Sequence, residues 1–391
     1  MRSESNYDLI IAGGGLAGAS LAVALRDCKL RIALIEGRPP TALNQTWDAR
    51  VYAVSPASLR FLETCGTLGH LDPGRIGPVY DMAVTGDRFG QIRFSAYDTG
   101  VESLASIMES SRLHAALWAQ LQQQANVTLF CPGRSADLRL NDDAASITLD
   151  NGERLTARLV VAADGRDSAL RHSAGLRAKT HDYNELGVVA NFQAERDHRG
   201  CAYQWFREDQ SVLAWLPLPD QHISMVWSCP PDLAKILLDM PPDELADAVG
   251  GAGADALGAL TCVTPAQAFP LKLITVAQTT AQRFALLGDA AHGIHPLSGH
   301  GINLGFSDAS VLSALLRDAA RAGDDPGSDA LLRRYASQRR QETFLLQQGT
   351  HALHELFRSR LPGLSLLRNF GLDLTQRLGP VKSLLARIAM G

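Results

Sequence analysis

The sequence lacks the features that mark several classes of protein. Its six cysteines include no Cys-x-x-Cys pair, so their spacing supports neither a metal site nor a disulfide framework. No apolar run reaches the ~18 residues that a membrane-spanning helix requires, and the first residues, MRSESNYD, have no apolar core of the signal-peptide kind. We therefore expect reduced thiols, no bound metal and a cytoplasmic protein.

An excess of basic charge is also absent. Lys and Arg number 37 against 41 Asp and Glu, which gives a formal net charge of −4. This balance argues against a nucleic-acid partner, because phosphate binding needs a concentrated basic face. Hydrophobic residues make up 46% of the chain and charged residues 20%, as in packed enzymes. At ~150 residues per domain, the 391 residues predict two or three domains.

The N-terminal segment follows the order strand, glycine turn, helix, strand, acid. The apolar run YDLIIA predicts a buried parallel strand, and a GxGxxG motif follows it at Gly13, Gly15 and Gly18. A second strand over residues 31–35 ends at Glu36, about 20 residues later, where a dinucleotide fold places the acid that binds an adenosine ribose. This order favours a dinucleotide site over a plain glycine turn, but does not distinguish nicotinamide from flavin.

Two later predicted strands also lead into an aspartate. Residues 158–162 run into Asp164 and Gly165, and residues 284–287 run into Asp289. Because extended cofactors bind in the crevice at the carboxyl ends of parallel strands, Asp289 is placed to bind a polyhydroxyl chain such as ribitol. The segment GDAAHGIHPLSGHGINLGFSDA, residues 288–309, then supplies glycines that let a flat ligand approach the backbone.

A helix is predicted directly after this glycine turn. Its apolar face comprises Ile302, Phe306, Ala309, Leu312, Leu316 and Ala319. The N-terminus of the helix points back at the turn, where its partial positive charge would favour negative charge on a reduced flavin ring.

Three histidines of the same segment, His292, His295 and His300, raise the alternative of a metal site. A ligand set needs fixed geometry and a supporting shell, and no further His or Cys cluster completes this one. We therefore interpret His292 as a packing residue beside Asp289.

The middle of the chain predicts an antiparallel sheet. Four short runs alternate partly between apolar and polar residues, at 186–194, 201–206, 211–216 and 222–228. With residues near 76–100, they are expected to form a substrate domain over the cofactor. Its tryptophans, Trp205, Trp215 and Trp227, are favoured as core residues, with pocket residues as the alternative. Residues 146–157 predict a hairpin around Asn151-Gly152.

The chain from about residue 345 is predicted to be helical, leucine-rich and basic. The basic residues are Arg358, Arg360, Arg368, Arg377, Lys382 and Arg387, against Asp373 as the one acid after Glu355. Packing on the rest of the protein is the favoured interpretation, and contact with an anionic membrane surface or a partner protein is the alternative.

Together these motifs resemble the class A flavoprotein monooxygenases, typified by p-hydroxybenzoate hydroxylase. The segments DARVYAVS (48–55), AWLPLPD (214–220) and RRYASQRRQE (333–342) further resemble the ubiquinone biosynthesis hydroxylases, which oxidise polyprenylated phenols. The resemblance spans nearly the whole chain. It implies an α/β fold with a Rossmann-like FAD-binding domain of the p-hydroxybenzoate hydroxylase type, an antiparallel β-sheet substrate domain and C-terminal helices.

The resemblance also implies where these domains lie in the chain. The expected FAD-binding domain is discontinuous and comprises residues 1–75, 101–182 and 269–344. The expected substrate domain comprises residues 76–100 and 183–268, and residues 345–391 form the C-terminal helical region.

Individual residues receive roles from the same resemblance. It implies that Gly13, Gly15, Leu16, Ala17 and Gly18 cradle the FAD pyrophosphate and that Glu36 holds the adenosine ribose. Arg50 and Arg112 match arginines that approach the cofactor, with a surface charge as the alternative.

The remaining matches lie at the later strand ends. Asp164 with Gly165 matches a pair that supports the pyrophosphate region and the use of NAD(P)H, with a purely structural carboxylate as the alternative. Asp289, Gly299, Gly301 and Asn303 complete the cofactor set. His295 and Pro296 match residues that line the flavin edge near the substrate, and we expect them to position the reactants at the catalytic face.

The implied activity is hydroxylation of the ring of a polyprenylated phenol, with FAD, NAD(P)H and O2, through a flavin C4a-hydroperoxide. The cofactor carries this chemistry while the protein excludes water and holds the ring, so no catalytic triad is expected. Three alternatives stay open: a hydroxylase of a small aromatic acid, a flavoprotein that reduces isoprenoid double bonds, and a flavin-binding assembly subunit. Association with the membrane periphery is a further expectation, because a prenylated substrate resides in the bilayer.

Overall fold

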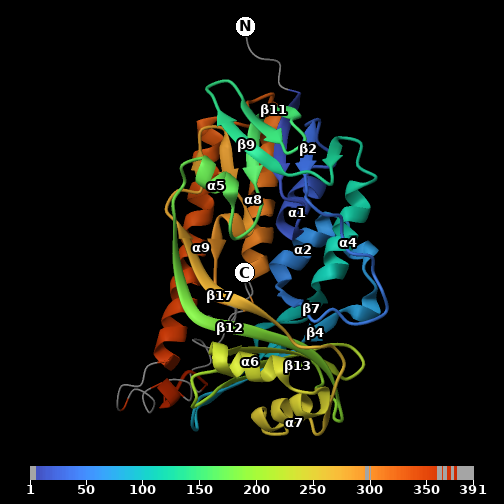
Figure 1. Ribbon diagram of the computed structural model, residues 1–391, viewed down its shortest axis with the longest axis vertical. Helices are drawn as coiled ribbons and strands as arrows, with labels where there is room; N and C mark the ends of the chain where they lie inside the picture. The colour runs from blue at the N-terminus through green and yellow to red at the C-terminus, as the bar shows by residue number, and fades with distance from the viewer. Residues whose placement is uncertain are drawn as a thin grey trace.

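A computed structural model describes residues 6–295, 299, 301–358, 363, 368–370 and 374–376. Two large sheets occupy opposite ends of the molecule, and a long C-terminal helix runs along one side from the first sheet to the second (Figure 1). Within the described residues, no helix is long and apolar enough to cross a membrane.

The first sheet has a parallel core with the strand order β19-β11-β1-β2-β8. Its apolar central strand is buried at its carboxyl end, as predicted for a parallel strand covered on both faces. An antiparallel extension contains the predicted hairpin at Asn151-Gly152, formed by β10 and β11. The strands are β1 (Tyr7–Ala12), β2 (Ile32–Ile35), β8 (Val127–Phe130), β9 (Ser135–Leu140), β10 (Ala145–Leu149), β11 (Arg154–Ala162), β18 (Thr280–Ala281) and β19 (Phe284–Leu286).

Helices bury one face of this sheet. A single apolar core joins β1 and β2 to three helices: α1 (Leu16–Ala24), α4 (Ser110–Leu121) and α8 (Gly301–Ala322). The predicted apolar face of α8 lies in this core, with Phe306, Ala309, Leu312 and Leu316 fully buried. The other face packs against β9, β10 and the short helix α5 (Ala169–Ser173). The helix periodicity in the sequence therefore identified the correct buried face.

The second sheet is antiparallel except for one parallel pair, and its strand order is β20-β17-β12-β15-β14-β13-β5-β6, with β16 beside β12. The predicted strands of the middle segment are confirmed, and residues near 76–100 join them through β5 and β6. The strands are β5 (Asp81–Thr85), β6 (Gln91–Ser95), β12 (Ala178–Ala194), β13 (Cys201–Phe206), β14 (Val212–Pro217), β15 (His222–Cys229), β16 (Leu260–Cys262), β17 (Gln267–Val276) and β20 (His292–Gly293).

Strand β12 is longer than predicted. Its first half, AKTHDYNE, is too polar to indicate a strand by apolar alternation, and pairing with β17 extends it back to Ala178. The pairing shifts register between Asp182 and Leu186, and Asn184 has a positive φ of 53°. One continuous, bulged strand thus passes through the boundary expected at residues 182–183.

Helices α6 (Pro231–Asp239) and α7 (Pro242–Ala252) cover the outer face of the second sheet, at the lower end in Figure 1. Trp215 and Trp227 are buried in the same core and Trp205 packs against it, so the core interpretation of the tryptophans is confirmed.

A small third sheet lies between the two large ones and was not predicted. Its strands are β3 (Val51–Val54), β4 (Gly77–Val79) and β7 (Ala105–Glu109), with α2 (Pro56–Thr64) and α3 (Ala96–Thr99) nearby in sequence. Short 3-10 turns occur at Thr67–His70, Pro73–Arg75 and Gly288–Ala290.

Helix α9 (Asp329–Arg358) connects both large sheets (Figure 1). Near its start, the Tyr335 hydroxyl donates to the Leu286 carbonyl of the first sheet at 2.9 Å. Farther along, Gln347 donates to the Ile274 carbonyl of the second sheet at 2.7 Å, and Phe357 stacks on Phe206 with ring centroids 3.7 Å apart. The two sheets are therefore held in one fixed arrangement by side chains of a single helix.

Candidate active site

The ends of three parallel strands meet at one point. Ala12 of β1 pairs in register with Ala162 of β11, which pairs with Leu286 of β19. The strand-end residues Gly13, Asp164 and Asp289 therefore follow neighbouring strands at the same sheet edge, as the sequence predicts. A ligand that lies across this edge can reach all three chain segments.

Two glycines of the turn are in close contact with other backbone atoms of the protein. Gly13 has a φ of +111°, and a Cβ there would lie 2.2 Å from the Ala163 carbonyl oxygen. A Cβ on Gly18 would lie 1.9 Å from the Gly13 carbonyl oxygen. Both positions accept only glycine, because backbone atoms occupy the space of any side chain: those of Ala163, after β11, at Gly13, and those of the turn itself at Gly18.

Gly15 differs from these two glycines because a Cβ there would meet nothing within 4 Å. It is the N-cap of α1 and offers no capping side chain, and Gly15, Leu16 and Ala17 all line the large cavity of the protein. The uncapped N-terminus of a helix is a favourable place for phosphate, since its N–H groups lack internal partners. This turn therefore fits the pyrophosphate of a dinucleotide.

Glu36 closes the turn from the second strand. One carboxylate oxygen accepts a hydrogen bond from the Gly14 amide at 2.7 Å, and the other accepts from the Arg38 amide at 3.0 Å. These two bonds hold the carboxylate beside the glycine turn, where the dinucleotide interpretation requires it.

The cavity has a volume of about 1150 Å³ and extends from the first sheet to the second. Ligand pockets commonly measure ~300–1,000 Å³, so this one has room for an extended cofactor together with a second molecule. Its first end is lined by backbone and polar groups, including Gly15, Arg50, Gly165, Asp289 and Gly301.

The other end of the cavity is apolar. Its side chains come from the second sheet and from α9, and include Val84, Ile92, Phe94, Phe206, Val212, Val226, Leu353, Leu356 and Phe357. An apolar compartment that opens on a polar, glycine-lined one suits a ligand with an apolar body whose reactive part faces the cofactor.

A buried ionic cluster supports the turn that carries Asp289. The Asp308 carboxylate of α8 accepts hydrogen bonds from the Gly288 amide at 2.9 Å, His292 at 2.7 Å and Arg339 at 2.6 Å. Burial alone would raise the pKa of Asp308, but His292 and Arg339 outweigh it and lower this pKa. Burial would lower the pKa of His292, but the Asp308 carboxylate outweighs this effect and raises that pKa.

A second buried cluster holds His295. His295 and His354 both contact the Glu185 carboxylate, with nitrogen–oxygen distances of 3.3 Å and 3.1 Å. Although burial would raise the pKa of Glu185, hydrogen bonds from the two histidines lower it to about 2. Burial lowers the pKa of His295, and Glu185 offsets only part of this effect. The His295 ring therefore lies in a packed cluster with residues of β12 and α9.

Some of the predicted site residues line the cavity and others do not. Arg50, Gly165, Asp289, Gly299 and Gly301 join Gly15, Leu16 and Ala17 in the cavity wall. Pro296 and His300 lie outside the described residues.

Like Glu36 and His295, three further predicted residues have internal partners. Arg112 pairs with Glu109 at 2.8 Å. The Asp164 carboxylate accepts from the Leu170 amide at 3.2 Å. Asn303 donates to the Ala53 carbonyl and accepts from the Ser55 amide, so it joins α8 to β3. Their contacts with a cofactor stay predictions.

Sequence reasoning missed the partners of both buried clusters. Arg339 pairs with Asp308, and His354 pairs with Glu185. The members of each pair are far apart in the chain, so only folding brings them together. Asp308 lies in the quoted segment 288–309 and Arg339 in the segment RRYASQRRQE, but neither segment by itself reveals that the two residues pair.

We predict that Asp308→Ala lowers the free energy of unfolding by about 3 kcal/mol, because it leaves the buried Arg339 without its main partner. Denaturant unfolding measures the loss. The control Asp318→Ala removes an exposed pair with Arg321 on the same helix and should cost at most about 1 kcal/mol. Equal losses in the two variants would contradict the supporting role of the cluster.

The pH dependence gives this prediction a second readout. The raised pKa of His292 adds stability that is complete below pH 6.5 and is lost as pH rises through the folded-state pKa. The lowered pKa of Asp308 adds stability above pH 3.8 that is lost as pH falls. The difference between native protein and Asp308→Ala should therefore be largest between these values and shrink as pH rises through the raised folded-state pKa of His292.

Comparisons with known proteins agree with this geometry. A family model described as an FAD binding domain matches residues 6–343. Ubiquinone hydroxylase UbiL of Rhodospirillum rubrum is 36% identical over 385 residues, which cover 98% of this chain and 89% of that protein. The 3-demethoxyubiquinol 3-hydroxylase of Escherichia coli is 31% identical over 386 residues, which cover 98% of each.

The fold is also similar to that of solved structures. The crystal structure of pqsL, a probable FAD-dependent monooxygenase from Pseudomonas aeruginosa, superposes with a TM-score of 0.79 at 22% identity, covering 93% of this chain and 99% of that one. The predicted fold class is confirmed. The chain belongs to the FAD-binding-domain family of class A flavoprotein monooxygenases, in the branch of the ubiquinone biosynthesis hydroxylases, and FAD is its cofactor.

Proposed function

We propose that this protein hydroxylates the aromatic ring of a polyprenylated phenol in ubiquinone biosynthesis, with NAD(P)H and O2 as co-substrates. The observation that carries the proposal is the single cavity that joins the glycine-lined strand ends to an apolar compartment. Two of the relatives, a ubiquinone hydroxylase and a 3-demethoxyubiquinol 3-hydroxylase, support the same substrate class.

The residues around the strand ends fit FAD. Gly13 and Gly18 let the protein backbone pack tightly at the turn, Gly15 to Ala17 present an uncapped helix N-terminus, and Glu36 is held beside the turn. We assign the pyrophosphate to this turn, the adenosine ribose to Glu36, and the rest of the cofactor to Arg50, Gly165, Asp289, Gly299 and Gly301. When bound, FAD supplies the redox chemistry and the activation of O2.

The protein's own part is to exclude water and orient the ring. The apolar wall contributed by the second sheet and by Leu353, Leu356 and Phe357 of α9 has the character to hold a phenol ring and a prenyl tail. We propose that His295, held by Glu185, is a positioning residue and transfers no proton.

Cofactor binding and substrate binding fall to different segments of the chain in this proposal. We propose that residues 1–75, 101–182 and 269–344 bind the cofactor and that residues 76–100 and 183–268 bind the substrate. Of residues 345–391, the described part of α9 completes the apolar compartment, since Leu353 and Phe357 belong to its wall.

Cofactor binding can be tested at Gly15 without disturbing the fold. We predict that Gly15→Leu reduces FAD affinity at least about tenfold, because a Cβ at this position meets no protein atom within 4 Å and the added side chain would enter the cavity that Gly15 lines. Flavin absorbance after purification and FAD titration of the apoprotein measure the effect. The control Gly69→Leu, also in open space but on an exposed turn, should bind FAD normally. Undiminished FAD binding by Gly15→Leu would contradict the assignment.

The activity itself is tested with isotopically labelled oxygen. Purified protein supplied with NAD(P)H, ¹⁸O2 and a short-chain prenylated phenol should release a hydroxylated product that contains one labelled oxygen atom. Mass spectrometry measures the incorporation. NAD(P)H-dependent reduction of the substrate without O2 would instead identify a reductase, and a preference for a carboxylated ring would identify a small-acid hydroxylase. Bound FAD without any product would favour an assembly subunit.

A prenylated substrate implies access to lipid. Helix α9 exposes Phe344 and Leu345, whose exposed fractions are 60% and 56%, and Phe370 and Leu374 are exposed as well. We propose that these exposed apolar side chains, Phe344 and Leu345 above all, contact the membrane periphery, where amphipathic segments bind.

We predict that the double variant Phe344→Ser/Leu345→Ser partitions into anionic phosphatidylglycerol vesicles at least roughly tenfold more weakly, because burial of each side chain contributes about 1.5 kcal/mol or more. Flotation with vesicles measures the bound fraction. The control Ile236→Ser removes an exposed apolar residue of α6 and should float like the native protein. Equal flotation of all three proteins would refute the proposed surface.

A further inference from the structure

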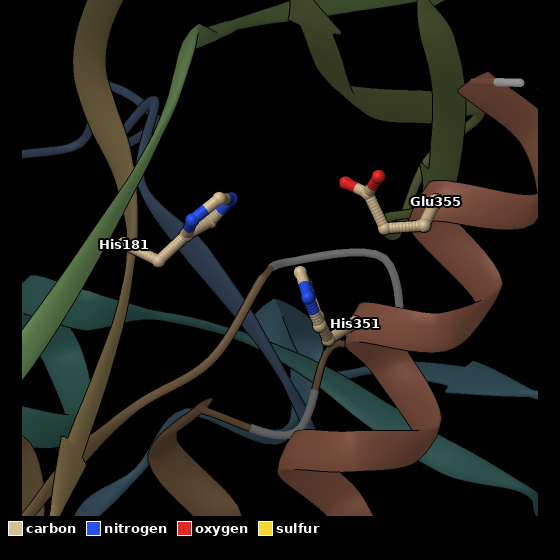
Figure 2. Close-up of side chains that lie close together, drawn as sticks. All are labelled: His181, His351 and Glu355. Carbon is tan, nitrogen blue, oxygen red and sulfur yellow. The ribbon is translucent and has the colours of Figure 1, made fainter.

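A second group of chemically active side chains lies outside the cavity, between β12 and α9. His181 comes from the strand, and His351 and Glu355 come from successive turns of the helix (Figure 2). The spacing of four residues places His351 and Glu355 on one face of α9, and both face His181. One ligand atom from each residue lies within 4.8 Å of the other two.

This set has the composition of a transition-metal site. Two imidazole nitrogens and one carboxylate oxygen are a common donor set for Zn²⁺, which binds such atoms at ~2.1 Å with tetrahedral geometry. Tetrahedral ligands at that distance lie about 3.4 Å apart, so the side chains must move inward by roughly 1 Å. His181 and Glu355 are exposed and His351 is half-buried, so small side-chain rotations can supply this movement.

Neighbouring residues orient two of the three ligands. The Tyr183 hydroxyl lies 3.2 Å from Nδ1 of His351. If Nδ1–H donates to the Tyr183 oxygen, Nε2 keeps its lone pair for a metal ion. The Glu355 carboxylate contacts Nδ1 of His354 through Oε1 at 3.3 Å. Partners of this kind are what fix ligand orientation and tautomer in metal sites.

The adjacent cluster of Glu185, His295 and His354 has a similar composition but differs in its burial and in its internal hydrogen bonds. Its carboxylate already contacts both histidines at 3.1–3.3 Å, and all three residues are buried. An ion there would have to displace these hydrogen bonds and lose its water. The exposed cluster imposes neither requirement, so it is the better metal site.

We propose that His181, His351 and Glu355 bind a divalent transition-metal ion of the Zn²⁺ type, with water at the fourth position. The ion links β12 to α9. Because Leu353, Leu356 and Phe357 of the same helix form part of the cavity wall, the ion also fixes the wall of the apolar compartment. Its role is structural, and no electron transfer or bond cleavage takes place at it.

The test uses full-length, FAD-loaded protein without an affinity tag, stripped of metal by a chelator. Isothermal titration with Zn²⁺ should show one equivalent bound, and Zn²⁺ should raise the melting temperature. His181→Ala, His351→Ala and Glu355→Gln should each weaken binding at least about tenfold and abolish the thermal shift. The control His172→Ala removes an exposed histidine on α5 and should behave like the native protein. Retained FAD content verifies that each variant is folded.

Three outcomes overturn the proposal. The first is the absence of Zn²⁺ binding to the native protein. The second is undiminished binding by all three variants, which would place the ion elsewhere, for example on the cysteines. The third is loss of binding in His354→Ala alone, which would place the ion in the buried cluster.

Discussion

The parallel pairing of β1, β11 and β19 is the constraint on which the rest of the site depends. It brings three chain segments, separated by more than a hundred residues each, to one sheet edge with their backbones in register. Each segment then needs only a short turn to present its groups: glycines after β1, Gly165 after β11 and Asp289 after β19. The Asp308 cluster holds the third turn in place by pairing its carboxylate with a backbone amide and two cationic side chains.

The cavity is lined by groups of different polarity from the two large sheets. The first sheet contributes backbone and polar groups, and the second contributes apolar side chains. Their relative position depends on β12 and α9, which are both long enough to pass from one region to the other (Figure 1). The buried Glu185 cluster and the group of His181, His351 and Glu355 both lie where these two elements meet, so contacts at this junction bear on the shape of the apolar compartment.

The features that sequence predicted well are those encoded locally. The GxGxxG turn with Glu36, the hairpin at Asn151-Gly152 and the apolar face of α8 each depend on residues close together in the chain. The missed features depend on distant partners. The polar first half of β12 is a strand because β17 lies beside it, and Arg339 is buried because Asp308 neutralises it. Arg112 pairs with Glu109, three residues before it in the chain, and its role at the cofactor stays a prediction.

A crystal structure of the FAD-loaded protein tests the central claim most directly. We expect the flavin and its diphosphate to lie across the carboxyl ends of β1, β11 and β19, in contact with Gly15, Gly165 and Asp289. The ring system should face the compartment lined by Phe206 and Phe357. FAD bound at another surface, or strand ends filled by side chains from the protein itself, would contradict the account.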